Sequence, residues 1–278
     1  MGTQRLTHRM HRRCHWTLGA LLSGLLAVPA HSQQSNEELA RAAQNPLASL
    51  ISVPFQLNTN FDTGPMEKTQ NVLNIQPVVP FSINSDWNLI SRTILPLIWQ
   101  PESVPGQGST FGLGDIQVNG FLSPKNSGEW IWGVGAVAQL PTNTNSVLGN
   151  DRWGLGPTAV VLHLEKGSPW VFGALINNIW SVSGSSTDPK YNLMTLQPFL
   201  NYNFPGGFYL TSSPLITANW EADSGQKWTV PLGGGVGKIV RFGKLPVNLQ
   251  ASAYYNVERP DNSPRWSLRL QAQLMFPK

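Results

Sequence analysis

The sequence predicts an all-β protein: a transmembrane antiparallel β-barrel of about twelve strands, preceded by a cleaved signal peptide and a short N-terminal helix. Apolar and polar residues alternate over segments of about ten residues, and the joints between segments are alternately short and long. Aromatic residues recur near both ends of the segments. Tilted strands of this length cross a bilayer, whereas strands of soluble sandwiches usually have about five or six residues.

The first 32 residues have the pattern of a signal peptide. Four arginines, at positions 5, 9, 12 and 13, precede an apolar run from Trp16 to Val28, with no acidic residue among them. The run is too short to span a bilayer as a helix, which argues against a membrane anchor. Small residues allow cleavage after Ala30 or after Ser32. We therefore expect residues 1–32 to direct export through the inner membrane and to be removed.

Removing this segment changes the charge balance of the chain. Four of the 19 Lys and Arg residues leave with it, so 15 basic residues face 15 acidic ones. The high isoelectric point then belongs to the signal peptide, and nothing else in the composition suggests a nucleic-acid partner. Cys14 also leaves, and His163 is the one histidine that remains. We expect no disulfide, no metal site and no cofactor.

Residues 33–48 contain the one helical pattern of the mature chain. Ser35 is a suitable N-cap, Glu37 and Glu38 favour a helix start, and Pro46 weakens its end. The segment is expected in the periplasm. It is either a short stub outside the barrel or a plug at the barrel mouth, and the sequence leaves both open.

Residues 49–278 carry the alternating pattern and are expected to form the barrel. The candidate strands lie near 50–60, 70–83, 87–99, 111–123, 129–140, 153–165, 169–182, 191–204, 207–220, 227–240, 244–257 and 265–276. Short turns at one end and long loops at the other are typical of outer-membrane barrels. An even number of strands brings both ends of the barrel to the short-turn side, which should face the periplasm.

The aromatic residues predict which face of each strand contacts lipid. Four pairs share a face and lie near opposite ends of one strand: Trp87 and Trp99, Trp170 and Trp180, Phe208 and Trp220, and Trp266 and Phe276. A sandwich core would also use tryptophan, but it would not require this end-to-end spacing. Aromatic belts at the two membrane interfaces explain the spacing better.

Prolines inside the predicted strands oppose this assignment. Eight of them fall there: Pro54, Pro77, Pro80, Pro96, Pro157, Pro198, Pro214 and Pro231. Proline donates no ladder hydrogen bond and normally avoids central strands. Bulges or shifted strand ends could accommodate some of them.

Several stretches resemble a known group of proteins. They are Gln44-Asn45-Pro46 with Pro54-Phe55-Gln56, residues 87–93 (WNLISRT), 111–116 (FGLGDI), 197–203 (QPFLNYN) and 217–223 (TANWEAD). The mature chain resembles a family of bacterial outer-membrane β-barrel proteins often labelled "neuromedin U" or transporter, and a related outer-membrane group named for the MetA pathway of phenol degradation. The resemblance implies a barrel and a transport role, and it brings no catalytic residues.

Signals for an enzyme are weak. A barrel phospholipase would need a histidine beside a serine nucleophile, and His163-Leu164-Glu165 lacks the serine two residues on. His163 is better explained as a lumen or strand-end residue. The run Gly233 to Gly237 lacks the Lys-Ser/Thr of a phosphate-binding loop and more often marks a bend or close packing. We do not expect an enzyme.

The polar strand faces predict the lumen. The residues expected to point inward, at a constriction or simply in a packed polar network, are Asn88, Arg92, Asn201, Asn203, Arg269, Gln271 and Gln273. In the first case Arg92 and Arg269 would select small solutes. Asp115, Glu221 and Asp223 are expected to supply negative charge near the external end.

These features together predict an outer-membrane channel or porin-like transporter of a Gram-negative cell, for passive passage of small molecules. Hydrophobic or aromatic solutes are suggested only by the name of the phenol-degradation group. A structural or adhesion barrel with a filled lumen is the alternative. Expected partners are outer-membrane lipid and lipopolysaccharide, the small-molecule solute, and the barrel-insertion machinery, which would read the final strand that ends at Phe276.

Overall fold

The computed structural model describes residues 34–184 and 189–277. The predicted signal peptide, residues 1–32, lies outside the described residues. One short α-helix, α1 (Asn36–Ala43), precedes the strands, and it begins with the capping box that Ser35 and Glu38 form reciprocally. In the described part of the chain, no helix is both long and apolar enough to cross a membrane.

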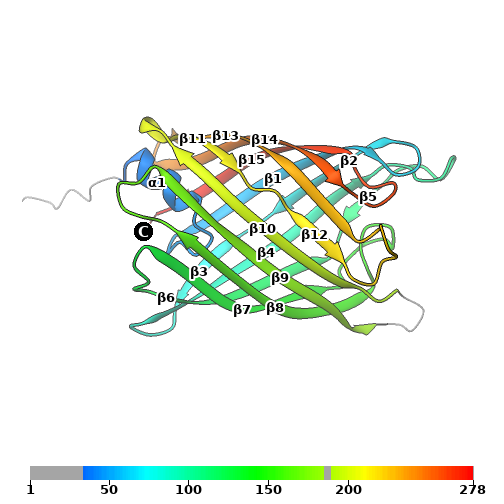
Figure 1. Ribbon diagram of the computed structural model, residues 1–278, viewed down its shortest axis with the longest axis horizontal. Helices are drawn as coiled ribbons and strands as arrows, with labels where there is room; N and C mark the ends of the chain where they lie inside the picture. The colour runs from blue at the N-terminus through cyan, green and yellow to red at the C-terminus, as the bar shows by residue number, and fades with distance from the viewer. Residues whose placement is uncertain (1–33, 185–188, 278) are drawn as a thin grey trace, which may run out of the picture. The chain divides into compact units, whose positions relative to one another are not determined.

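Fifteen strand segments follow α1 and run diagonally around a closed wall (Figure 1). They are β1 (Ile51–Thr63), β2 (Lys68–Ile75), β3 (Val78–Ser82), β4 (Trp87–Gln100), β5 (Thr110–Leu113), β6 (Ile116–Pro124), β7 (Trp130–Leu140), β8 (Arg152–His163), β9 (Trp170–Gly184), β10 (Asn192–Asn203), β11 (Phe208–Ser212), β12 (Ile216–Asn219), β13 (Trp228–Phe242), β14 (Leu245–Glu258) and β15 (Trp266–Phe276). A single turn of 3₁₀-helix, η1 (Pro205–Gly207), joins β10 to β11.

The segments make a closed antiparallel barrel of twelve strands. Three of the twelve strands are each interrupted once and consist of two segments. These pairs of segments are β2 and β3, β5 and β6, and β11 and β12. The remaining segments pair with their neighbours along the chain, and β15 pairs with β1 from Ile51↔Phe276 to Phe61↔Trp266. The predicted fold class and strand number are therefore confirmed.

The joints alternate between the two ends of the barrel, as predicted. The short turns, residues 83–86, 125–129, 164–169, 204–207 and 243–244, lie at one end with α1 and the end of β15 (Figure 1). The longer joints at the other end include residues 101–109, 141–151 and 220–227. We call these the short-turn end and the long-loop end.

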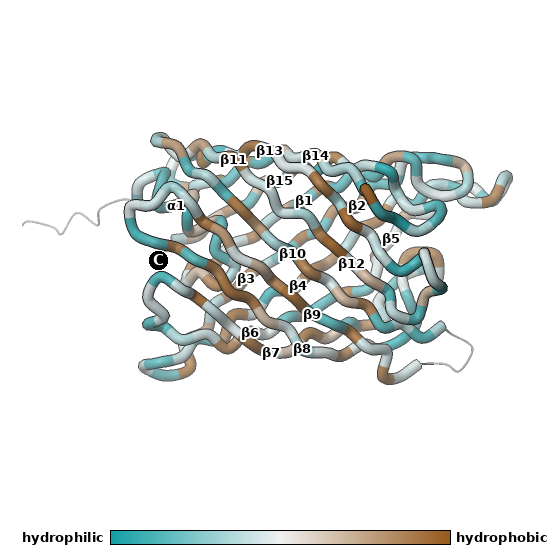
Figure 2. The backbone as a smooth tube through the Cα atoms, in the orientation of Figure 1, coloured by the Kyte–Doolittle hydropathy of each residue, from teal (hydrophilic) through white to brown (hydrophobic). Residues whose placement is uncertain are grey.

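The outer face is apolar and rich in aromatic side chains. All ten tryptophans in the described residues are exposed, and so are Phe208 and Phe276. On β15, Leu270 is 44% exposed while its neighbour Arg269 is 9% exposed, as the predicted alternation requires. Hydrophobic residues recur along the strands, and hydrophilic ones gather in the turns and loops (Figure 2). Ten exposed tryptophans would be unfavourable in water but suit a lipid interface.

The breaks in the ladder explain most of the prolines. Pro77 and Pro214 lie in the breaks between β2 and β3 and between β11 and β12. Pro54 faces the first break, because its carbonyl accepts the N–H of Gln76 at 2.9 Å. In an antiparallel ladder, the N and O of one residue point toward the same neighbouring strand. An N–H at position 54 would therefore also point into the break, where it would have no strand partner.

The other prolines follow the same rule. Pro96 accepts from Gly114 in the break between β5 and β6, at 2.9 Å. Pro198 and Pro231 lie on β10 and β13 opposite the break between β11 and β12, and Pro231 also follows a bulge against β14. Pro157 lies where the β8–β9 ladder skips from Leu155 to Thr158, and Pro80 lies past the start of β1. All eight thus avoid a place where an N–H is needed.

Candidate functional site in the barrel lumen

The N-terminal segment, residues 34–50, lies inside the barrel at the short-turn end. Leu39 and Ala40 of α1 are fully buried in a cluster with Tyr209, Ile239 and Met275, which point inward from β11, β13 and β15. Leu47 is buried in a second cluster that includes inward residues of β4, β6, β8 and β9: Ile90, Phe121, Val160, Leu162, Val171 and Leu175. The segment therefore contacts opposite sides of the wall and crosses the lumen.

Polar contacts fix α1 to the short turns. The Arg41 guanidinium donates to the carbonyls of Glu165 and Ser168, in the turn between β8 and β9. The N–H of Gly206, in η1, donates to the Glu37 carboxylate. That bond, with the Glu37 backbone N–H and the Ser35 hydroxyl, lowers the pKa of Glu37. Such bonds hold the start of the segment in one orientation.

Two further contacts reach the strands themselves. Arg241 Nε of β13 donates to Asn36 Oδ1 at 3.0 Å. Gln44 and Asn203 exchange side-chain hydrogen bonds, with Gln44 Nε2 to Asn203 Oδ1 at 2.8 Å and Asn203 Nδ2 to Gln44 Oε1 at 3.1 Å. The paired amides fix the position at which the chain leaves the helix.

A glycine makes room for the large inward side chain of Tyr209. Tyr209 is 1% exposed, and a Cβ placed on Gly237 of the neighbouring strand would lie 2.1 Å from its ring. The Gly233–Gly237 run thus serves close packing, one of the two structural roles that the sequence suggested.

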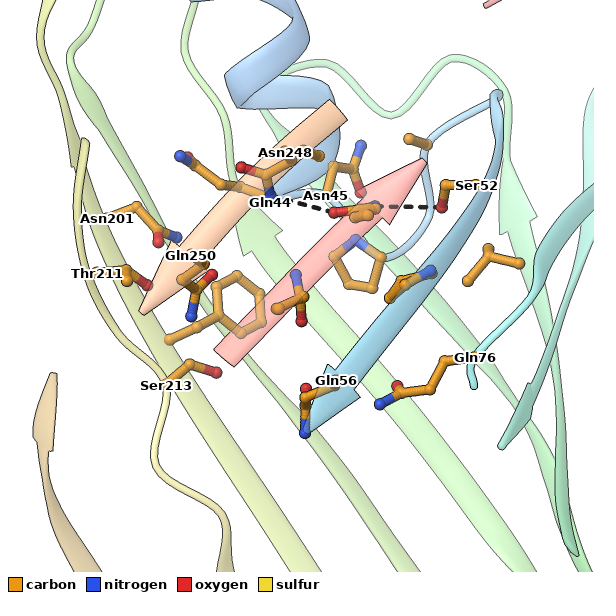
Figure 3. A pocket seen from close by; sticks show the side chains of 18 of the residues that line it. Gln44, Asn45, Ser52, Gln56, Gln76, Asn201, Thr211, Ser213, Asn248 and Gln250 are labelled. Atoms are coloured by element: carbon orange, nitrogen blue, oxygen red, sulfur yellow. Dashed lines mark hydrogen bonds between the residues drawn. The ribbon is translucent and has the colours of Figure 1, made fainter. Parts of the chain in front are cut away.

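A cavity of about 170 Å³, which we call the chamber, lies between the N-terminal segment and the wall. Amide side chains surround it beneath α1 (Figure 3). Its polar lining comprises Gln44, Asn45, Ser52, Gln56, Gln76, Arg92, Gln197, Asn201, Tyr209, Thr211, Ser213, Asn248, Gln250, Arg269, Gln271 and Gln273. Apolar surface comes from residues such as Pro54, Leu175 and Phe199. The chamber is amphipathic and contains no carboxylate among its described lining residues.

A chain of hydrogen bonds organises one side of the chamber. Gln273 Nε2 donates to Ser52 Oγ at 3.2 Å, and Asn248 Nδ2 donates to Gln273 Oε1 at 3.2 Å. The Tyr209 hydroxyl donates to Asn248 Oδ1 at 2.8 Å. The chain links β1, β15, β14 and β11, and it orients amides that could otherwise rotate.

Two arginines face the chamber from separate strands. Arg92 Nη2 of β4 donates to Gln76 Oε1 at 2.6 Å. Arg269 Nε of β15 donates to Asn58 Oδ1 at 3.1 Å, and its Nη1 donates to the Ser213 carbonyl at 3.0 Å. The Arg269 guanidinium also lies 4.9 Å from the centre of the Tyr254 ring. All these partners are neutral.

The predicted inward residues divide into three groups. Arg92, Asn201, Arg269, Gln271 and Gln273 line the chamber. Asn203 does not line it but holds Gln44 of the N-terminal segment. Asn88 is on the same face of β4 as Arg92 but nearer the short-turn end, outside the chamber lining.

Sequence reasoning missed the part of the lining that the N-terminal segment supplies, including Gln44 and Asn45. It also missed Tyr209, since an aromatic residue on a barrel strand suggests an outward position. The available signal was the presence of apolar residues at inward positions near the short turns, such as Phe121, Leu162 and Ile239. Apolar side chains that point into a lumen are unfavourable in water, so they indicate that another segment of the chain packs against them.

The three acidic residues predicted at the external end all lie at the long-loop end. Asp115 accepts the Asn150 N–H at 2.6 Å and Gln139 Nε2 at 3.2 Å, so it helps to order the loop from 141 to 151. Glu221 and Asp223 are exposed in the joint between β12 and β13. They do not meet Asp115 in a hydrogen bond or ion pair.

His163 lies at the short-turn end of β8, among aromatic rings. Its ring centre is 4.8 Å from that of Trp130 and 5.1 Å from that of Phe172, and its Nε2 is 3.7 Å from Glu129. The surroundings are those of the aromatic belt rather than of a nucleophile. Among the described residues, no three His, Cys, Asp or Glu side chains are placed to bind one metal ion.

The profile of a family described as "Putative MetA-pathway of phenol degradation" matches residues 59–276, most of the barrel. The chain belongs to this family. The membership confirms the resemblance that the sequence motifs indicated. No curated protein matches the chain.

Solved structures similar to the chain are outer-membrane barrels. The COG4313 outer membrane channel from Pseudomonas putida F1 has 18% identity and a TM-score of 0.61, and the match covers 82% of this chain and 94% of that one. The NanC porin has 10% identity and a TM-score of 0.49, covering 82% and 100%. Outer membrane phospholipase A from Escherichia coli has 12% identity and a TM-score of 0.45, covering 83% and 99%.

The likeness to the COG4313 barrel concerns the fold, and the exposed aromatic belts are what that fold requires in lipid. The chain therefore has the fold of an outer-membrane β-barrel.

Proposed function

We propose that this barrel is a passive channel for small solutes and that the N-terminal segment is its narrowest point. The observation that carries the proposal is the chamber, a space of about 170 Å³ inside the barrel with an ordered polar lining. If side chains simply filled the lumen, they would be close-packed, because protein interiors leave few voids larger than a water molecule. An open space with a polar lining is better explained if solutes occupy it.

A barrel of twelve strands has a narrow lumen compared with the open lumens of 16 to 18 strands. The segment narrows it further, so passage is restricted to small molecules. The segment is a plug in this proposal, rather than a stub outside the barrel. Its mixture of apolar contacts and polar tethers suits an element that shifts while remaining attached at the short turns.

A structural barrel with a closed lumen is the second candidate. The burial of Leu39 and Leu47 against opposite walls favours it, since these contacts close the short-turn end. The two candidates differ in solute flux, not in fold.

Swelling of liposomes that contain the purified protein separates these candidates. We expect swelling with small solutes and a steep loss of rate as solute size increases, because the restriction is narrow. The matched control is the swelling of liposomes of the same lipid without protein. Swelling no faster than the control for every solute would favour the structural barrel.

The proposal also places the short-turn end in the periplasm and the long-loop end outside, after export by the signal peptide. Cysteines substituted for Asn145 and Asn126 occupy the long 141–151 loop and the short 125–129 turn, respectively. On intact cells, an impermeant maleimide should label Asn145→Cys and not Asn126→Cys. Labelling of Asn126→Cys alone would reverse the orientation, and permeabilised cells provide the control for reactivity.

A further inference from the structure

We infer that the chamber is a binding site for a small organic anion, a carboxylate with a compact apolar body, held between Arg92 and Arg269. The inference deepens the proposed function and rests on it only in that the solute must reach the lumen. Both guanidiniums line the same cavity, and they come from β4 and β15, which are separated by β1 and the interrupted β2–β3 strand.

The charge of the chamber is the first step. Its described lining residues include two arginines and no aspartate or glutamate. Neither arginine belongs to any of the ion pairs formed by the described residues. Arginine remains protonated in proteins, so the site carries two positive charges. Buried charges are normally paired, since removing a charge from water costs free energy that neutral groups repay only in part.

The unused donors are the second step. A guanidinium has five N–H groups, and in the described structure Arg92 makes one hydrogen bond, to Gln76. Arg269 makes two, to Asn58 and Ser213. N–H groups therefore remain at both arginines for an acceptor in the chamber. A carboxylate matches the planar fork of a guanidinium, which gives the shortest and strongest bonds of this kind.

The shape and the apolar wall define the rest of the ligand. Pro54, Leu175 and Phe199 place apolar surface beside the amides. A cavity of roughly 150 Å³ is large enough to hold benzene in an engineered protein. A chamber of about 170 Å³ has comparable room for an aromatic or branched aliphatic body next to one carboxylate. Inorganic anions would use the arginines but leave the apolar wall without contacts.

Titration calorimetry on the purified full-length mature barrel in detergent tests the site. The probes are benzoate, its neutral analogue benzamide, and acetate, which keeps the charge and lacks the apolar body. We expect benzoate to bind at least about tenfold more tightly than either of the others. Benzamide lacks the charge-assisted bond, which contributes about tenfold or more to affinity. Acetate keeps that bond but lacks the apolar surface that the ring buries against the wall. Equal affinity for benzoate and benzamide, or no binding of benzoate, would overturn the inference.

Variants assign the binding to the arginines. Arg92→Met removes the charge at the side chain with fewer structural bonds, and it should weaken benzoate binding at least about tenfold. Arg259→Gln, in the loop between β14 and β15, is the matched control and should bind normally. Arg269→Met removes the second charge and should also weaken benzoate binding at least about tenfold. If Arg269→Met does not fold, Arg269→Lys, which keeps the charge, should still bind benzoate more tightly than benzamide. Unchanged binding in folded Arg92→Met contradicts the inference.

The failure of this inference differs from the failure of the proposed function. Benzoate binding without solute flux would retain the anion site and reject the channel. Flux without any preference for benzoate over benzamide in binding would retain the channel and reject the anion site.

Discussion

Leu39→Asp is expected to displace α1 from the lumen and to raise the single-channel conductance several-fold. Leu39 is fully buried in a cluster with Tyr209, Ile239 and Met275, so the new carboxylate would be buried among largely apolar side chains. Loss of a buried leucine alone costs about 2–5 kcal/mol, and an unpaired buried charge adds to this. The segment precedes β1 and takes no part in the strand pairing, so we expect the barrel to stay folded when the segment is displaced.

Ser49→Asp is the control for this substitution. It adds the same carboxylate to the same segment at an exposed position, so its conductance should equal that of the parent. Heat-modifiable migration on gels confirms that both barrels are folded. If folded Leu39→Asp conducts like the parent, the segment does not restrict the lumen.

Leu270→Arg is expected to reduce the amount of folded barrel in the outer membrane strongly, whereas Gln271→Arg should assemble. Leu270 is exposed on the lipid face near the middle of β15, and Gln271 lines the chamber. An arginine at the bilayer midplane of a barrel costs about 2–4 kcal/mol, while the same side chain in the lumen meets polar groups.

The measurement is the fraction of heat-modifiable barrel in outer-membrane fractions of cells that express each variant. The two substitutions introduce the same residue one position apart, so strand propensity and chain charge are matched. Equal assembly of both variants would mean that the lipid and lumen faces are not distinguished by this alternation.

The wall of the barrel was predictable because lipid and lumen impose opposite demands on successive residues. Trp87 and Trp99 on β4, and Leu270 beside Arg269 on β15, show a period of two that a single strand carries by itself. The alternation of short and long joints is equally local. These features need no knowledge of the neighbouring strands.

The interior of the short-turn end was harder to predict, because its pattern depends on a partner from elsewhere in the chain. Phe121, Leu162 and Ile239 are apolar and point inward, against the rule for a water-filled lumen. They are covered by Leu39 and Leu47, and the sequence left open whether the N-terminal segment would reach them. The in-strand prolines were unexplained for a similar reason, since their places depend on breaks, irregular pairing or strand ends in the ladder with neighbouring strands. Asn88 is on the predicted face of β4 but lies outside the chamber, because it is nearer the short-turn end of the strand than Arg92. The alternation of a single strand predicts the face and not this position along the barrel.

The central claim is that solutes pass through the lumen and that the N-terminal segment restricts them. Single-channel conductance in planar bilayers tests it most directly, with the full mature chain compared with a chain that lacks residues 34–48. The account predicts small discrete steps for the full chain and clearly larger steps for the shortened one, with both barrels heat-modifiable. The absence of steps from both folded proteins, or steps of the same size in the two, would contradict it.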